Sequence, residues 1–203
     1  MKPSKLCFIM TASLLAACAQ QSHRTTDLSQ LTTPQERSKQ AETTASQLTS
    51  WTLTGAMAAK SERKSWSANI HWSQQGANAY QIRLLGPLGS GSLLVEQHHG
   101  RITLIDGAKS VSSNNASTLL KEQTGIGLPV HHLYYWVRGL PAPVTIQAEQ
   151  HDEKGHLIGL KQAGFSIHYA NYRLINGMAL PSKIQLYGNG ITMKMAIKHW
   201  AAS

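Results

Sequence analysis

The sequence predicts a mainly β fold with some α structure: about eleven antiparallel strands and about three helices in one domain. Apolar and polar residues alternate over many short segments, and Gly, Asn and Asp mark the turns between those segments. The period becomes helical only near the start and in the middle of the chain. Because a flat sheet of this size exposes its edges, we expect the sheet to form a barrel or to curl strongly.

Helices are expected at 34–47, 116–124 and 130–138. Pro34 suits a first helical turn, Asn114 or Asn115 suits the cap of the second helix, and Pro129 suits the start of the third. The alternating segments predict strands at 51–58, 66–72, 80–85, 93–95, 101–106, 109–112, 144–150, 156–162, 165–172, 182–187 and 191–199.

The first eighteen residues have the composition of a bacterial export signal. Lys2 and Lys5 precede an apolar run over 6–14, and small residues then lead to Cys18. This run is shorter than the about 20 residues that cross a bilayer. The ending Leu15-Ala16-Ala17-Cys18 resembles a lipobox, in which the cysteine carries lipid, although a plain signal peptide with a coincidental cysteine is the alternative. We expect a lipoprotein signal peptide over 1–17 and lipidation at Cys18.

Residues 18–33 are rich in Gln, Ser and Thr and have few apolar members. This composition is typical of a flexible tether, so we expect the folded domain to occupy 34–203. A single acyl chain binds a membrane weakly and two or more anchor firmly, so a multiply acylated Cys18 would fix the domain to a membrane. Lipoproteins kept in the inner membrane typically carry Asp after the lipidated cysteine. Ala19 therefore points by resemblance to the outer membrane.

A short turn of unusual composition, Gly86-Pro87-Leu88-Gly89, joins the apolar runs 82–85 and 93–95. Turns of this kind normally carry polar residues at their tips, whereas this one carries Leu88. One interpretation is that Leu88 folds back onto the domain or is one of the many singly exposed apolar residues that proteins tolerate. The other is that it contacts something apolar outside the protein, and the turn residues leave both open.

Large apolar residues on the inward phase of the predicted strands, with two from the third helix, admit two interpretations. The simpler is a packed core. The other is a cavity for an apolar ligand, because side chains need not fill a barrel of this strand number and Met adapts to varied acyl chains. The candidate cavity-lining residues are Trp51, Leu53, Trp66, Ile70, Trp72, Ile82, Leu84, Leu133, Trp136, Phe165, Ile167, Tyr169, Met193 and Met195.

Catalytic and cofactor motifs are not recognisable in the sequence. It contains no Gly-x-Ser-x-Gly elbow, phosphate-binding glycine loop or His-Glu-x-x-His, so we expect neither an enzyme nor a cofactor. The adjacent pairs His98-His99 and His131-His132 point in diverging directions and do not predict a metal site. The formal charge of +9 favours an anionic partner in general, and no Lys/Arg run indicates nucleic acid.

Taken in order along the chain, these segments resemble the LolB family of outer-membrane lipoprotein receptors over nearly the whole length. The resemblance rests on their order and spacing together, and no single short motif is decisive. The segments that carry it are Leu15-Ala16-Ala17-Cys18, Trp51-Thr-Leu-Thr-Gly55, His71-Trp72, Arg83-Leu-Leu-Gly-Pro-Leu-Gly89, Thr124-Gly125-Ile-Gly-Leu-Pro129, Trp136-Val-Arg-Gly-Leu-Pro141, Leu180-Pro181 and the strand closing on Trp200.

The resemblance implies an unclosed antiparallel barrel, covered by helices, that encloses an apolar cavity. It further implies a monomer anchored in the inner leaflet of the outer membrane and facing the periplasm. Such a receptor takes lipoprotein cargo by its acyl chains from a LolA-type periplasmic carrier, and the leucine of the protruding turn, here Leu88, helps to insert the cargo. The family often has a polar residue where this chain has Gly86. The alternative is a structural outer-membrane lipoprotein whose barrel is packed and binds no ligand.

Overall fold

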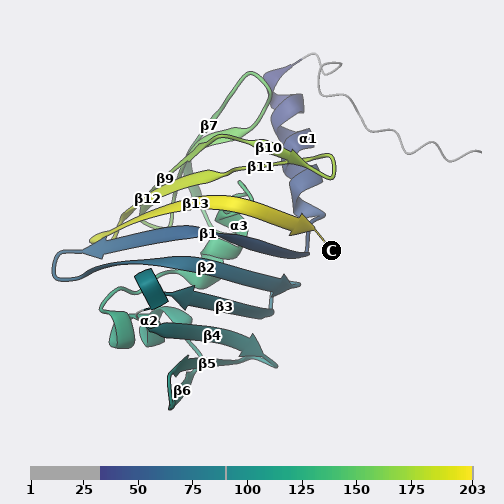
Figure 1. The fold of residues 1–203 in the computed structure, drawn as a ribbon. Helices are drawn as coiled ribbons and strands as arrows, with labels where there is room; N and C mark the ends of the chain where they lie inside the picture. Colours follow the sequence, from purple (N-terminus) through teal and green to yellow (C-terminus); the bar gives the residue numbers. More distant parts are fainter. Residues whose placement is uncertain (1–32, 90, 203) are drawn as a thin grey trace, which may run out of the picture.

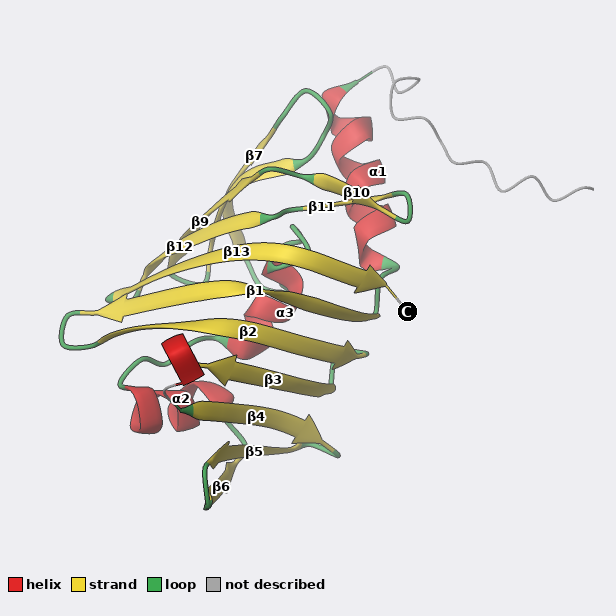
Figure 2. Cartoon of the chain, in the orientation of Figure 1, coloured by secondary structure: helices red, strands yellow, loops and turns green. Residues whose placement is uncertain are grey.

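The computed structural model describes residues 33–89 and 91–202, which form one large, curled antiparallel sheet with helices on one face (Figures 1 and 2). The predicted signal peptide over 1–17, the predicted lipidation site Cys18 and almost all of the tether predicted over 18–33 lie outside the described residues. Within the described ranges, no helix is both long and apolar enough to span a bilayer.

The sheet has eleven strands in the order β6-β5-β4-β3-β2-β1-β13-β12-β9-β8-β7. Because β6 and β7 are its two edges, the sheet is not closed, which confirms the predicted fold class. Its strands are β1 Ser50–Ser61, β2 Ser65–Gln75, β3 Ala79–Leu85, β4 Ser92–His98, β5 Arg101–Asp106, β6 Lys109–Ser113, β7 Ile146–His151, β8 Leu157–Gln162, β9 Phe165–Ala170, β12 Lys183–Gly188 and β13 Ile191–Ala202.

Three α-helices lie close to their predicted positions: α1 Pro34–Ser46, α2 Ala116–Thr124 and α3 Val130–Trp136. Thr33 and Glu36 form a capping box at the start of α1, and Asn115 caps α2 by accepting from two backbone N–H groups. The segment 114–145, which contains α2 and α3, carries the chain from edge strand β6 to edge strand β7. The helices therefore lie behind the sheet in Figure 1 and cover its inner face.

The two halves of the sheet meet where β1 pairs with β13. Met57 lies opposite Met195, and the register shifts by a β-bulge between Thr54 and Gly55. A Cβ at position 55 would lie only 2.1 Å from the carbonyl oxygen of Ala196, so glycine is required there. A bulge bends its strand and increases the local twist, which helps this long sheet to curl around its inner face.

One hairpin was not predicted. Strands β10 Arg173–Ile175 and β11 Met178–Leu180 form a separate two-stranded ribbon, whereas the sequence prediction left this segment unassigned. Asn176 and Gly177 form its turn, and both have positive φ. Asn-Gly is the strongest short signal for a tight hairpin, and the prediction overlooked it.

The two faces of the sheet differ sharply in composition. On β1 and β2 the inward residues such as Leu53, Ile70 and Trp72 are buried, while alternate residues such as Asn69 and His71 are exposed. Strand β13 shows the same alternation over much of its length. The core therefore lies between the inner face of the sheet and the helices.

Candidate functional site

The predicted turn at Leu88 projects from the end of the β3–β4 hairpin. Leu84 pairs with Leu93 one position before the end of the β3–β4 ladder. The N–H of Gly86 donates to the carbonyl of Gly91 at 3.1 Å and closes the loop. Residues Pro87–Gly89 form the short helical turn η2. The hairpin is therefore held at its base, and its tip is left free of the sheet.

Leu88 combines two unfavourable features. Its side chain is fully exposed, with a relative accessibility of 107%. Its backbone is left-handed, with φ 54° and ψ 24°, a conformation that costs a residue with a Cβ about 1–2 kcal/mol. Strain at an exposed apolar residue is not explained by packing within the domain, so Leu88 is available to a partner outside it.

A hollow of about 450 Å³ opens beneath this turn. On one side it is lined by Pro87 and by Trp66, Ala68 and Leu84, which belong to the inner face of the sheet. Gln123 at the end of α2 lines the opposite side. The volume lies within the about 300–1,000 Å³ range of ligand sites, and we call this the turn-side hollow.

A second hollow of about 310 Å³, which we call the far-end hollow, lies where β2 turns into β3. Its apolar lining comes from Trp72, Tyr80 and Tyr134, and polar residues such as Gln97 and Asn115 surround them. Burial raises the pKa of Tyr80 above its ordinary value, and the hydroxyl is protonated at neutral pH with or without this shift. The inner face is therefore hollowed at two separate places.

The residues predicted to line a cavity are all buried except Trp66, which is half-buried, and they belong to one core cluster or pack against it. Trp66 and Leu84 line the turn-side hollow, and Trp72 lines the far-end hollow. Met195 lines a hollow on the outer face, described below, and the others pack mostly against neighbours: Trp51 lies 5.1 Å from Trp72 between ring centroids, for example. The structure thus places these residues on one face, and their role in binding acyl chains stays a prediction.

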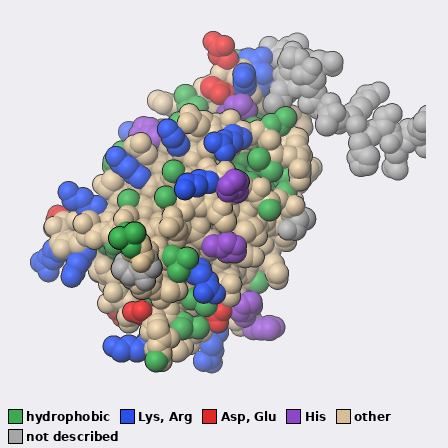
Figure 3. Space-filling model, in the orientation of Figure 1, with side chains coloured by type: hydrophobic (Ala, Val, Ile, Leu, Met, Phe, Trp, Pro, Cys, Tyr) green, Lys and Arg blue, Asp and Glu red, His purple; other side chains and the backbone are tan. Residues whose placement is uncertain are grey.

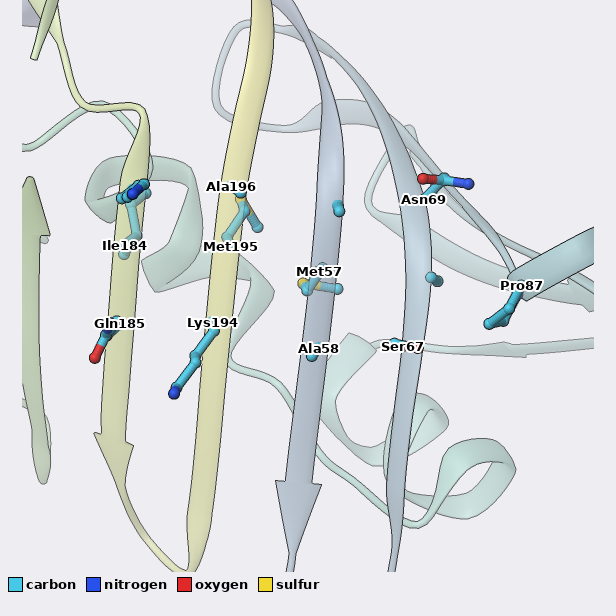
Figure 4. Close-up of a pocket in the computed structure, with 13 residues that line it drawn as sticks. Met57, Ala58, Ser67, Asn69, Pro87, Ile184, Gln185, Lys194, Met195 and Ala196 are labelled. Carbon is cyan, nitrogen blue, oxygen red and sulfur yellow. The ribbon is translucent and has the colours of Figure 1, made fainter. Parts of the chain in front are cut away.

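A third hollow of about 470 Å³ lies on the outer face, which the sequence analysis did not consider (Figure 4). Small residues such as Ala58, Ser67 and Ala196 form its floor, Lys194 lies on one side of it and Pro87 on the other. The Leu88 turn therefore borders a hollow on each face of the sheet.

A buried polar network was also missed. The side chain of Gln162 accepts from Trp136 Nε1 at 2.9 Å and from the Ala142 N–H at 2.8 Å, and donates to the carbonyls of Ala142 and Val144. It thereby fastens the segment after α3 to β8. The sequence did contain a signal for this network: Gln162 lies two residues after Leu160 on β8, so both side chains point to the same, buried face of the strand.

Arg138 is a second buried polar residue, and it too was missed. It donates from Nε to the Tyr134 carbonyl at 3.0 Å and from Nη1 to the Leu48 carbonyl at 2.7 Å, and its guanidinium lies 4.0 Å from the Tyr134 ring centroid. Burial lowers its pKa. These bonds join the segment after α1 to α3.

The titratable residues do not form a metal centre. Across 33–89 and 91–202 there is no group of three His, Cys, Asp or Glu side chains that could hold an ion. The ion pair recorded there joins His156 Nδ1 to Asp152 Oδ2 at 3.0 Å, in the turn between β7 and β8. The geometry described above is that of three hollows with mixed apolar and polar lining, two of which border the turn that exposes Leu88.

Known proteins have sequences similar to this one. A family model described as outer membrane lipoprotein LolB matches residues 49–200. Among curated relatives, the outer-membrane lipoprotein LolB of Cellvibrio japonicus is 36% identical over 198 residues, covering 95% of this chain and 93% of that one. The protein of the same name from Ectopseudomonas mendocina is 36% identical over 156 residues and covers 76% of each chain.

Solved structures share the fold. A LolA superfamily protein from Nitrosomonas europaea matches with a TM-score of 0.50 at 9% sequence identity, over 85% of this chain and 94% of that one. At this identity the likeness concerns the fold alone. The family match, by contrast, extends over the sheet, helices α2 and α3 and the Leu88 turn, and with the relatives it shows that the chain belongs to the LolB family of outer-membrane lipoproteins.

Proposed function

We propose that this protein accepts lipoproteins from a LolA-type periplasmic carrier by binding their acyl chains, and that it inserts them into the outer membrane. The family and the names of its relatives support a role in outer-membrane lipoprotein localisation. The observation that carries the finer proposal is the exposed, strained Leu88, in a turn whose Gly86 and Pro87 line a hollow with Trp66, Leu84 and Leu93 on its apolar side and Asp106 and Gln123 on its polar side. Cys18 would anchor the receptor by its lipid, facing the periplasm.

The proposed handoff is physical and needs no catalytic residue or cofactor. Acyl chains pass from one apolar site to another, so the exposure of many methylenes to water, at about 0.8 kcal/mol each, is avoided. Direction then comes from relative affinity: the receptor holds the chains more tightly than the carrier does, and the bilayer more tightly still. Leu88 enters the membrane surface and brings the turn-side hollow to it.

Acyl chains would enter through the turn-side hollow, past Trp66 and Leu93. Deeper inner-face residues, such as Ile70 and Ile82, are buried at 3% and 6% exposure, so long chains must displace side chains as they enter. The Met residues of the inner face, Met57, Met193 and Met195, are flexible enough to repack. This packed interior also favours the second candidate, a structural lipoprotein that takes no ligand.

The deciding experiment is transfer of a labelled lipoprotein from its carrier to the full-length chain. We expect transfer without added energy, and we expect Ala68→Phe, which fills the turn-side hollow, to lower it at least tenfold. Because Ala68 lines the outer-face hollow as well, the matched control is Ala58→Phe, at an alanine that lines the outer-face hollow and not the turn-side hollow, and it should leave transfer unchanged. Circular dichroism checks that both variants fold. No transfer to the folded parent chain from a loaded carrier would favour the structural lipoprotein instead.

A further inference from the structure

The outer face of the central strands carries positive charge without negative charge. Strands β9, β12, β13, β1, β2 and β3 are neighbours in the sheet and contain no Asp or Glu. Figure 3 views the molecule from this side and shows Lys and Arg spread over it, with Asp and Glu towards the rim. Its exposed cations, which we call the basic face, are Lys60, Arg83, Lys183, Lys194 and Lys198.

None of these cations forms an ion pair with a carboxylate of the described residues, where the recorded ion pair is the distant His156–Asp152; the carboxylate nearest in register is Glu96 on β4, a diagonal neighbour of Arg83. Lys183 lies opposite Ala196, and Lys194 is two residues earlier on that strand, so the two lysines are diagonal neighbours whose backbone positions lie about 7–8 Å apart. Like charges this close repel one another. An unpaired cluster of this kind favours an anionic surface over it.

The basic face continues directly into the Leu88 turn. Pro87 borders the outer-face hollow whose other side is formed by Lys183 and Lys194, so the turn lies against this face of the sheet (Figure 4). The turn that exposes Leu88 thus shares this hollow with two cations, which lie across strands β1 and β2 from it. Apolar side chains flanked by Lys and Arg are the combination that binds the interface of an anionic membrane.

The composition of the basic face distinguishes a membrane from an acidic protein partner. Protein interfaces have apolar, often aromatic centres and are depleted in Lys. The centre of this face instead carries Lys194 among Ala56, Ala58, Ser67 and Ala196. Small residues between long cations leave a shallow surface that headgroup phosphates can approach from many directions.

We propose that the basic face lies on anionic phospholipid headgroups and orients the receptor so that Leu88 meets the bilayer. This inference rests on the proposed function, because it assumes that the Leu88 turn works at a membrane. Each Lys or Arg near an anionic surface raises the binding constant about fivefold. Removing Lys183 and Lys194 therefore lowers the ratio of membrane-facing to free orientations roughly 30-fold, and reversing their charge lowers it further.

The test measures orientation in the full-length chain, purified from membranes and reconstituted in vesicles. A fluorophore on Gln185→Cys reports from between the two lysines, and one on Ser110→Cys reports from the edge strand β6. The unsubstituted chain, treated with the same fluorophore, gives the background from the natural cysteines. Quenching by headgroup-spin-labelled lipid is then compared between vesicles with phosphatidylglycerol and vesicles of phosphatidylcholine alone.

We expect strong quenching at position 185, little at position 110, and loss of the difference in phosphatidylcholine. Lys183→Glu with Lys194→Glu should abolish the quenching, as should raising salt to about 1 M, where the Debye length is about 3 Å. Lys109→Glu with Lys154→Glu changes the net charge equally at exposed sites off the basic face and should leave the quenching intact.

Equal quenching at both positions, or quenching that survives the Lys183 and Lys194 reversal, overturns the proposal. The proposal is also overturned if Lys183→Glu with Lys194→Glu leaves the orientation unchanged and weakens only the binding of an acidic protein. The lipoprotein transfer assay is independent of this readout. If transfer fails and the quenching is as expected, the proposed receptor function is contradicted and the membrane-facing orientation is supported. If transfer succeeds and the quenching is absent, only the proposed orientation is contradicted.

Discussion

Two regions of this protein reverse the usual distribution of polarity. The Leu88 turn exposes a large apolar side chain to water, and the region around Gln162 and Arg138 buries polar side chains at 0% and 2% exposure. They differ in whether each unusual side chain has a partner. The functional groups of Gln162 and Arg138 are hydrogen-bonded within the chain, whereas Leu88 projects away from it.

This difference separates a structural role from an interaction role. A buried polar side chain is stable only when its donors and acceptors are satisfied, so a complete network serves the fold. An exposed apolar side chain in a strained backbone conformation gains nothing from the fold and is retained for another reason. Substitutions should therefore affect unfolding at the first region and lipoprotein transfer at the second.

The largest effect on stability is expected for Gln162→Leu. The variant keeps the volume but removes hydrogen bonds to Trp136, Ala142 and Val144, leaving buried groups unsatisfied at a total cost of roughly 4 kcal/mol. Urea unfolding measures this loss. Gln123→Leu, at an exposed position on α2, is the control and should change stability by less than about 0.5 kcal/mol. If both variants unfold at the same urea concentration, the network is not what holds this region.

Arg138→Met should cost somewhat less, roughly 3 kcal/mol, because it removes two charge-assisted hydrogen bonds and the contact with Tyr134. Hydrogen exchange should show the loss first where Leu48 meets α3. Arg138→Lys keeps the charge without the planar fork, and its stability should fall between those of Met and the parent. If Arg138→Lys were as unstable as Arg138→Met, the geometry of the guanidinium and not its charge would determine the stability of this region.

Leu88→Glu should change stability by less than about 0.5 kcal/mol, because the side chain touches nothing that folding buries. We expect acyl chains still to be accepted from the carrier but their release into vesicles to fall at least tenfold. Leu174→Glu provides the matched control, since Leu174 is 74% exposed on the β10–β11 ribbon. Normal release by Leu88→Glu would place Leu88 among the merely tolerated exposed leucines.

The smallest effect concerns a solvated polar pair. Partial burial raises the pKa of Asp152, but hydrogen bonds from the backbone and ring of His156 and from the Lys154 N–H lower it more, and the net pKa lies below its ordinary value. The resulting stability is present above the unfolded pKa and is lost as pH falls through the folded one. Asp152→Asn should remove less than about 1 kcal/mol at pH 6 and almost nothing at pH 2. Urea midpoints at the two pH values measure this, and a loss independent of pH would contradict it.

Local signals were sufficient for most of the fold. The Asn115 cap and Gly125, with φ 77°, bound α2 at the residues predicted, because both act within one helical turn. Alternation placed the main strands and their inward faces. The β10–β11 ribbon was missed even though Asn176-Gly177 is a local hairpin signal. The sequence therefore contained the information, and the prediction overlooked it.

The site was only partly predictable. Leu88 stood out because its turn is local, and the structure shows the exposure that the sequence left open. Strand parity assigned Trp66 and Trp72 to one face but could not show that they border different hollows, at opposite ends of β2. Nor could it show that Pro87 borders the same hollow as Lys183 and Lys194, which lie about a hundred positions away in the sequence.

The sequence by itself determined which residues form helices and strands, which side of each strand is apolar, and that a leucine lies at the tip of one hairpin. These properties depend on neighbours within a few positions. Only the tertiary structure decided that β1 meets β13, that Gln162 and Arg138 are satisfied inside, and that unpaired cations share one face. Each of these depends on contacts between distant segments, and strand pairing across the whole sheet fixes them.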